Sequence, residues 1–229
     1  MVTPISPNAS LVWWRGAWAV AVKDFRSEWR SRAAFNAIAL FSLAAPVALG
    51  YALTNLKLEP ETLGGLLWTT LFFAAMVGLP RAFVKEEESG TAALLRLHYS
   101  AQSVLWGKVT GQLVLLLSTQ LAAVPLFLLL FNAKVSQPFS LLAILLGGDI
   151  GLAISSCIVG AMAAQARARG ALFPALAAPL LLPLLATLSV ATGFAFGAVG
   201  DVWPALKVIV AFDVALLAAS WILFDFVWE

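Results

Sequence analysis

Residues 81–108, RAFVKEEESGTAALLRLHYSAQSVLWGK, form the longest charge-bearing stretch between two long apolar segments of this chain. They contain an acidic run, Glu86, Glu87 and Glu88, which is followed by a Ser-Gly break. The next residues, TAALLRL, favour a helix, and Ser103 can cap a further apolar helix that begins at Val104. The stretch therefore predicts a short helix, flanked by charge, that lies between two membrane spans and is suited to contact a soluble partner.

The composition indicates a membrane protein. Of the 229 residues, 62% are hydrophobic and 11% are charged, and the mean hydropathy is +0.93. Soluble domains carry about 25% charged residues, so this much apolar surface requires lipid as its solvent. The net charge of +2 is too small to indicate a nucleic-acid partner. A single cysteine, Cys157, excludes an internal disulfide.

The N-terminal region predicts an interfacial helix. Residues 1–10 are polar and contain two prolines, and no cationic segment followed by a short apolar run marks a signal peptide. Between residues 11 and 32, apolar side chains recur at helical spacing. Five cations occupy other positions of this segment: Arg15, Lys23, Arg26, Arg30 and Arg32. Cations and several tryptophans together favour an amphipathic helix in the membrane interface; the alternative is the frayed start of the first span.

The rest of the chain predicts an all-α integral membrane protein with six spans. Each apolar segment reaches the roughly 20 residues that a span requires. The expected spans are 33–54, 63–84, 104–131, 139–164, 171–193 and 205–227, within a single permease-like domain of residues 1–229. If the N-terminus is cytoplasmic, eleven Lys and Arg residues lie on that side. Only Lys57, Lys134 and Lys207 lie on the other. This bias favours cytoplasmic N- and C-termini and a cytoplasmic loop after the second span.

Two acids lie deep in the expected spans. Asp149 and Asp213 fall roughly 12–15 Å from the nearest span end at about 1.5 Å per residue. An ionised carboxylate costs at least a few kcal/mol at that depth, and no Lys or Arg is expected there. Each acid must be protonated, line a wet cavity, or bond neighbours such as Ser155 or Thr187. They are candidates either for a functional pathway or for structural hydrogen bonding.

The chain has no evident catalytic machinery of its own. Gly107-Lys108-Val109 resembles the end of a phosphate-binding loop, but Gln102 and Val109 replace residues which that motif needs. His98 is the only histidine, so a metal site built on a histidine pair and bis-histidine haem ligation are excluded. No Ser/His/Asp set can be assembled near one surface. We therefore expect a non-catalytic chain that binds no cofactor itself.

Several segments in a fixed order along the chain carry a family resemblance: residues 23–32 (KDFRSEWRSR), 66–68, 81–83 with the acids that follow, 89–95 (SGTAALL), 107–109, 167–172 (RARGAL) and 180–185. In this order they resemble the family of haem exporter protein B, the permease of the ABC-type complex in cytochrome c maturation. The resemblance covers about residues 20–190.

The resemblance implies an ABC-2-type permease of the bacterial inner membrane that works with a separate ATPase subunit. It also implies a haem-handling membrane partner, a haem chaperone and a possible second permease copy. ATP would bind the ATPase and haem would be handled by the partners, with energy used for haem export or for release of the haem-loaded chaperone. The expected residues for coupling to the ATPase are Glu86, Glu87, Glu88, Leu94, Leu95 and Arg96.

Two other classes stay open at this stage. Permeases for drugs, lipids or polysaccharides also have six spans and an amphipathic entry helix. A membrane scaffold without any ATPase is a further alternative. Co-purification with an ATPase subunit would separate the scaffold from both kinds of permease.

Overall fold

The computed structural model describes residues 9–54, 56–80, 83, 86, 90–165 and 169–228. Within these residues the chain forms helices joined by turns and short connections, and none of them lies in a β-strand. The helices are α1 (Ala9–Ser31), α2 (Ala33–Ala52), α3 (Pro60–Gly78), α5 (Thr91–His98), α6 (Ala101–Leu130), α7 (Pro138–Gln165), α8 (Arg169–Phe196) and α9 (Val202–Trp228). The prediction of an all-α protein is confirmed.

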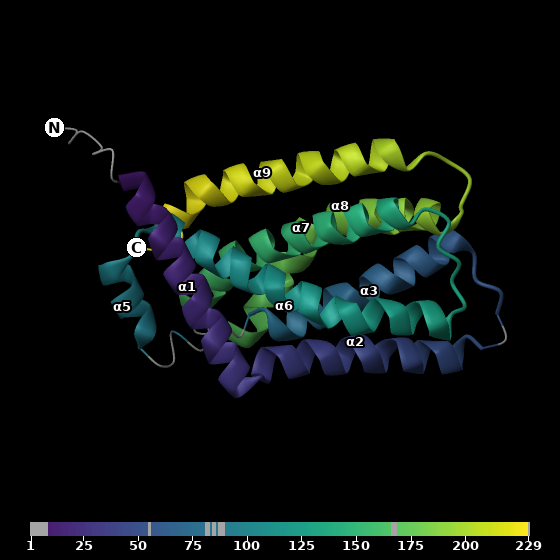
Figure 1. Ribbon diagram of the computed structural model, residues 1–229, viewed down its shortest axis with the longest axis horizontal. Helices are drawn as coiled ribbons and strands as arrows, with labels where there is room; N and C mark the ends of the chain where they lie inside the picture. Colours follow the sequence, from purple (N-terminus) through teal and green to yellow (C-terminus); the bar gives the residue numbers. More distant parts are fainter. Residues whose placement is uncertain are drawn as a thin grey trace.

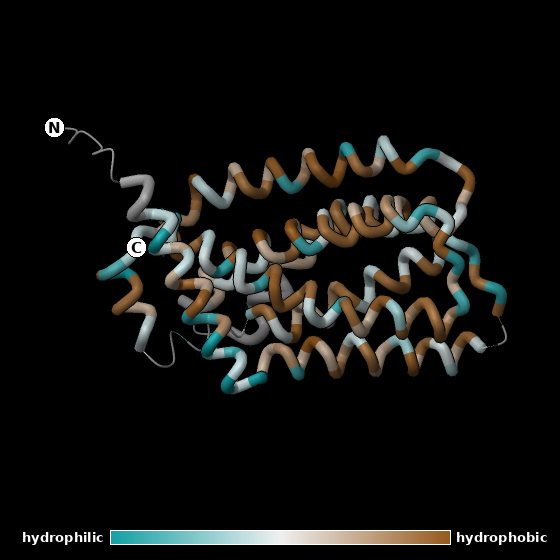
Figure 2. The backbone as a smooth tube through the Cα atoms, in the orientation of Figure 1, coloured by the Kyte–Doolittle hydropathy of each residue, from teal (hydrophilic) through white to brown (hydrophobic). Residues whose placement is uncertain are grey.

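Six helices, α2, α3, α6, α7, α8 and α9, contain segments long and apolar enough to cross a membrane. The spanning segments are Ala33–Ala52, Pro60–Gly78, Ala101–Leu130, Pro138–Ala163, Leu176–Phe196 and Val202–Trp228. They overlap the six expected segments. Figure 2 shows the apolar colour along these helices and the hydrophilic colour gathered near their ends.

Two expected helix boundaries are wrong. Ser100, not Ser103, is the N-cap of α6, and its hydroxyl accepts a hydrogen bond from the Ser103 amide. The Ser103 hydroxyl instead donates to the carbonyl of Trp13 in α1, at 3.2 Å. α3 ends at Gly78 rather than near residue 84. Pro80 follows closely, and a proline cannot donate the next backbone bond of a helix.

α7 is the central helix of the bundle, and its glycines let neighbouring helices approach closely. A Cβ atom at Gly148 would lie 2.0 Å from the ring of Trp68 in α3, and one at Gly147 would lie 2.7 Å from Ile209 in α9. The Trp68 indole N–H donates to the Thr192 hydroxyl of α8 at 2.8 Å. Small residues at close helix contacts are typical of membrane bundles.

α1 lies across one end of the bundle, transverse to the spans (Figure 1). It packs against α6 at a close contact, where a Cβ atom at Gly107 would lie 2.6 Å from Val20. Trp14, Trp18, Phe25 and Trp29 are all exposed. At about 100° per residue, these four aromatics fall within roughly 60° of arc. α1 therefore has one face on the bundle and a separate exposed aromatic face, as an interfacial helix requires.

A sharp elbow joins α1 to α2. Arg32, the residue between the two helices, has a φ of 52°, in the left-handed region. That conformation costs a non-glycine residue about 1–2 kcal/mol. The Phe35 amide at the start of α2 donates to Glu28 Oε1 at 2.9 Å, which satisfies one donor of the new helix.

The elbow end of the bundle also carries α5, the start of α1 and the end of α9. The connections from α2 to α3, from α6 to α7 and from α8 to α9 lie at the opposite end (Figure 1). Three tryptophans hold α1, α6 and α9 together at the elbow end. The ring centroids of Trp13, Trp106 and Trp221 are 6.3–6.5 Å apart in each pairing.

Candidate coupling site

α5 has one face on the bundle and one face exposed. Ala92 and Leu95 are buried against the end of the bundle. Leu94 is 57% exposed and Leu97 is 80% exposed. The exposed leucines are three residues apart and therefore lie on one side of the helix. The short helix predicted after the Ser-Gly break exists, and it presents an apolar surface away from the bundle.

The end of α9 holds α5 in place. The Arg96 guanidinium lies 5.2 Å from the ring centroid of Trp228, a cation–π distance. Trp228 also stacks on Phe224 at 5.7 Å and meets the edge of Phe83 at 6.4 Å. The last turn of the chain thus connects α5 to the segment that precedes it.

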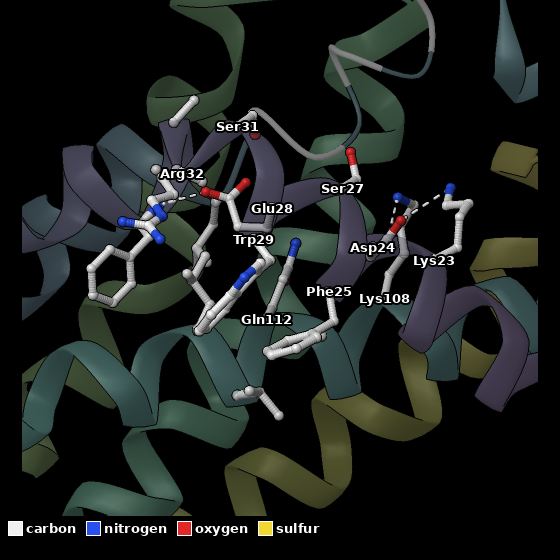
Figure 3. A pocket seen from close by; sticks show the side chains of 18 of the residues that line it. Lys23, Asp24, Phe25, Ser27, Glu28, Trp29, Ser31, Arg32, Lys108 and Gln112 are labelled. Carbon is white, nitrogen blue, oxygen red and sulfur yellow. Dashed lines mark hydrogen bonds and ion pairs between the residues drawn. The ribbon is translucent and has the colours of Figure 1, made fainter.

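Four charged side chains form a closed network where α1, α6 and the segment before α5 meet. Lys108 Nζ of α6 is 3.2 Å from Asp24 Oδ2 and 2.8 Å from Glu86 Oε2. Lys23 Nζ of α1 is 3.0 Å from Asp24 Oδ1 and also pairs with Glu86. Each lysine therefore contacts both carboxylates. Figure 3 shows Asp24 joined by dashed lines to both Lys23 and Lys108. We call these four residues the ion network.

The ion network is balanced in charge and largely removed from water. The Lys108 side chain has no exposed surface, and that of Glu86 is 8% exposed. Lys108 Nζ also lies 4.6 Å from the ring centroid of Phe83. A buried charge is costly unless it is paired, and here two cations face two anions. The ion network fixes Glu86, and with it the start of the α5 segment, to α1 and α6.

The pKa of Lys23 is raised above its usual value of 10.5. Burial alone would lower it, but the carboxylates of Asp24 and Glu86 outweigh burial by attraction and hydrogen bonding. Lys23 therefore stays charged throughout the physiological range. The same attraction makes the ion network sensitive to strongly alkaline pH.

The expected coupling residues have different environments. Leu94 is exposed, and Arg96 is half-buried on Trp228. Glu86 and Leu95 are buried inside the chain, so they differ from the expectation of a contact surface. Glu87 and Glu88 lie outside the residues that the structure describes. Leu97, which the sequence analysis did not select, is the most exposed leucine of α5.

The two intramembrane acids are both buried, on different helices. Gln120 of α6 donates to Asp149 Oδ1 of α7 at 2.6 Å. Asp213 of α9 faces α7, where a Cβ atom at Gly151 would lie 2.7 Å from Asp213 Oδ1. Of the alternatives for these acids, bonding to Ser155 or Thr187 does not occur: Thr187 donates to the Pro183 carbonyl of its own helix, and the Ser155 hydroxyl bonds neither acid.

Sequence reasoning missed the amide side chains that serve this polar core. Gln112 and Gln120 are eight residues apart, about two helical turns, and so share one side of α6. Gln112 Oε1 accepts hydrogen bonds from the Ser156 hydroxyl and from the Cys157 thiol of α7, the latter at 3.3 Å. Two glutamines at this spacing in an otherwise apolar span were the available signal.

The ion network was also missed, although its members are visible in the sequence. Lys23 was assigned to the interface and Lys108 to a failed nucleotide motif. Their common site required knowing that α1 folds back on α6, which brings residues 84 positions apart into contact. The sequence did contain one signal: Lys108 lies within the first turns of an apolar span, where a lysine needs an acidic partner from another part of the chain.

Comparison with known families decides the assignment. The family model described as CcmB protein matches residues 15–224, nearly the whole chain. The chain belongs to the CcmB family. This confirms the resemblance to haem exporter protein B, so the chain is a multi-pass membrane subunit of a transport system for cytochrome c maturation. No curated protein and no solved structure matches the chain.

For a CcmB protein the candidate coupling site has a clear physical character. It contains no group of three or more potential metal ligands among the described residues. It offers a small apolar surface on α5, an aromatic anchor at Trp228, and the ion network beneath. The described residues of this site thus form an apolar contact surface supported by paired charges.

Proposed function

We propose that this CcmB protein transmits the energy of ATP hydrolysis from a separate ATPase subunit to a haem-handling membrane partner. The work done is either haem export or release of a haem-loaded chaperone from that partner. The observation that carries the proposal is the two-faced α5, with Ala92 and Leu95 packed inside and Leu94 and Leu97 exposed. An apolar surface on an otherwise charged loop is best explained by a protein partner. The CcmB assignment favours this function over export of drugs, lipids or polysaccharides.

The contacts between α5 and the bundle would transmit a movement of α5 to the membrane spans. An ATPase that fits α5 differently in its two nucleotide states would shift the equilibrium between two positions of α5. Trp228 would carry that shift to α9, and Glu86 would carry it through the ion network to α1 and α6. Packed elements with paired charges favour discrete positions over gradual deformation.

The test of docking is the double variant Leu94→Asp/Leu97→Asp. Charge at both exposed positions would leave two unpaired carboxylates in an apolar contact, so co-purification of the ATPase subunit should fall about tenfold or more. Leu56→Asp is the matched control, because Leu56 is 61% exposed and belongs to the α2–α3 connection, which lies at the opposite end of the bundle. ATPase binding that is equal in the double variant and the control would remove α5 from the interface.

We further propose that the elbow end, with both chain termini, faces the cytoplasm of a bacterium with this chain in its inner membrane. The support is the excess of Lys and Arg on the segments expected at that side. Reporter fusions after the last residue and beside Lys134 should give opposite sidedness. The same sidedness at both positions would contradict six spans.

Haem, in this proposal, is bound by the partners and ATP by the ATPase. His98, the single histidine, is exposed at the end of α5, and its Nδ1 lies 2.9 Å from the Leu94 carbonyl. One imidazole in a wet position competes poorly with the paired ligands of dedicated haem carriers. His98→Ala should therefore leave assembly of c-type cytochromes nearly intact. Stoichiometric haem on the isolated chain, lost in that variant, would show direct haem binding instead.

A further inference from the structure

A cavity of about 940 Å³ opens at the elbow between α1 and α2, against α6. Its volume is in the range of small-molecule sites. Apolar side chains dominate its wall, among them Phe25, Trp29, Leu79, Val114 and Leu115. The cavity lies where the interfacial helix meets the first span, which is the depth at which lipid headgroups join their acyl chains.

Gln112 supplies a buried donor to this cavity. The residue is 4% exposed, and its carbonyl oxygen is occupied by Ser156 and Cys157. Its amide nitrogen Nε2 has no hydrogen-bond partner among the residues that the structure describes. Figure 3 shows this amide group rising from α6 towards α1, between Trp29 and Lys108 in this view. A buried donor without a partner is costly, so a ligand with an acceptor oxygen would satisfy it.

The charges that line the cavity decide which ligand fits. Six charged residues line it: Lys23, Asp24, Glu28, Arg32, Glu86 and Lys108. Four of them are the ion network and compensate one another. Glu28 and Arg32 remain, and neither has an ion-pair partner among the described residues. Glu28 Oε1 accepts a hydrogen bond from the Phe35 amide at 2.9 Å, and the cavity wall thus carries one carboxylate and one guanidinium outside the ion network.

We propose that this cavity holds one phospholipid with a zwitterionic headgroup that carries a primary ammonium. Its ammonium pairs with the Glu28 carboxylate, and its phosphate pairs with the Arg32 guanidinium. An ester carbonyl accepts the hydrogen bond from Gln112 Nε2, and the acyl chains lie on the apolar wall. An anionic lipid would leave Glu28 facing negative charge, and a quaternary ammonium headgroup could not donate hydrogen bonds to it.

The bound lipid would contact both the α1–α2 elbow and the ion network. Trp29 forms a wall of the cavity, and the Arg32 guanidinium lies 5.7 Å from its ring centroid. Asp24 and Glu86 line the same cavity from the side of the ion network. The lipid therefore lies between the α1–α2 elbow and the residues that fix α5.

The chain offers a variant that adds volume at the cavity wall. A Cβ atom at Gly111 would have Asp24 Cβ, at 3.7 Å, as its nearest neighbour, so the first atom of the side chain in Gly111→Leu makes an ordinary van der Waals contact. Gly50→Leu is the matched control, because a Cβ at this helical glycine of α2 meets nothing within 4 Å and the residue does not line the cavity. Arg32→Gln removes the phosphate partner, and Arg30→Gln is its neighbour outside the cavity.

The experiment is native mass spectrometry of the detergent-purified full chain, after delipidation and titration with phosphatidylethanolamine, phosphatidylcholine or phosphatidylglycerol. We expect one phosphatidylethanolamine per chain, with weaker retention of the other two. Gly111→Leu and Arg32→Gln should weaken that retention about tenfold, and Gly50→Leu and Arg30→Gln should leave it unchanged. Equal retention of all three lipids, or unchanged retention in Gly111→Leu, would overturn the proposal. Loss of a second chain in Gly111→Leu with unchanged lipid would assign the cavity to a protein contact.

Discussion

Two regions of this CcmB protein bury carboxyl groups in different ways. At the elbow end, Asp24 and Glu86 each contact two lysines, so the ion network is ionised and balanced. In the middle of the bundle, Asp149 contacts the amide of Gln120, and neither Asp149 nor Asp213 has a lysine or arginine within ion-pair distance among the described residues. The same residue type therefore serves as a charged connection near the membrane surface and as a hydrogen-bonding group within it.

The difference follows from what a span can supply. Near a membrane surface a lysine can reach buried acids at a modest cost in desolvation of its ammonium group, because water and headgroups are close. In the centre of a span a cation is expensive, and an amide is the cheaper partner for a carboxyl group. The ion network therefore joins α1, α6 and Glu86 by paired charges, whereas Asp149 joins α7 to α6 by a hydrogen bond from Gln120.

The largest effect should come from removing one cation of the ion network. Lys108→Met leaves Asp24 and Glu86 with Lys23 as their remaining lysine, so one buried carboxylate is uncompensated. Loss of one partner of a buried pair costs about 3–5 kcal/mol. Unfolding of the purified chain in detergent, followed by circular dichroism, measures this loss.

Glu86→Gln in the Lys108→Met background restores the balance of charge. It should recover more than half of the lost stability, and a double variant no better than Lys108→Met would mean that Lys108 acts by packing rather than by charge.

An intermediate effect is expected at Asp149. Asp149→Leu removes the acceptor for Gln120 and leaves that amide buried without a partner, at a cost of about 1–3 kcal/mol. Asp149→Asn keeps an acceptor oxygen and nearly the same shape, so it should be milder. The same unfolding measurement compares the two variants. If Asn is as damaging as Leu, Asp149 is needed as a charge, and the contrast between the two regions fails.

The smallest effect concerns alkaline pH and Lys23. Because the pKa of Lys23 is raised in the folded chain, its contribution to stability is fully present below about 10.5 and is lost as the pH rises through the folded value. Its side chain is 41% exposed, so the contribution is at most about 1 kcal/mol. Above about pH 10.5 the wild type should lose stability more steeply with rising pH than Lys23→Met. Parallel pH profiles for the two chains would contradict the assignment.

The sequence alone was sufficient for the all-α class, six apolar segments long enough to span a membrane, the helix α1 with its exposed aromatic side chains, and the helix α5. Each of these depends on residues close together in the chain: runs of apolar side chains, tryptophans among cations, and a helix-forming segment after a Ser-Gly break. It also placed Asp149 and Asp213 inside spans. Each of these features depends on the average properties of neighbouring residues, so it can be predicted without knowing which helices contact one another.

The tertiary structure decided which of those residues meet. Glu86 and Leu95 looked like surface residues beside charge, but both are buried. Glu86 pairs with Lys23 and Lys108, and Leu95 lies in an apolar cluster with residues of α6 and α9. Lys23, Asp24 and Lys108 came together because Arg32 turns the chain sharply and α1 lies back across α6. Ion pairs and the partner of an intramembrane acid depend on the relative placement of whole helices. That placement is set by the sum of many small packing contacts, which no local window of the sequence contains.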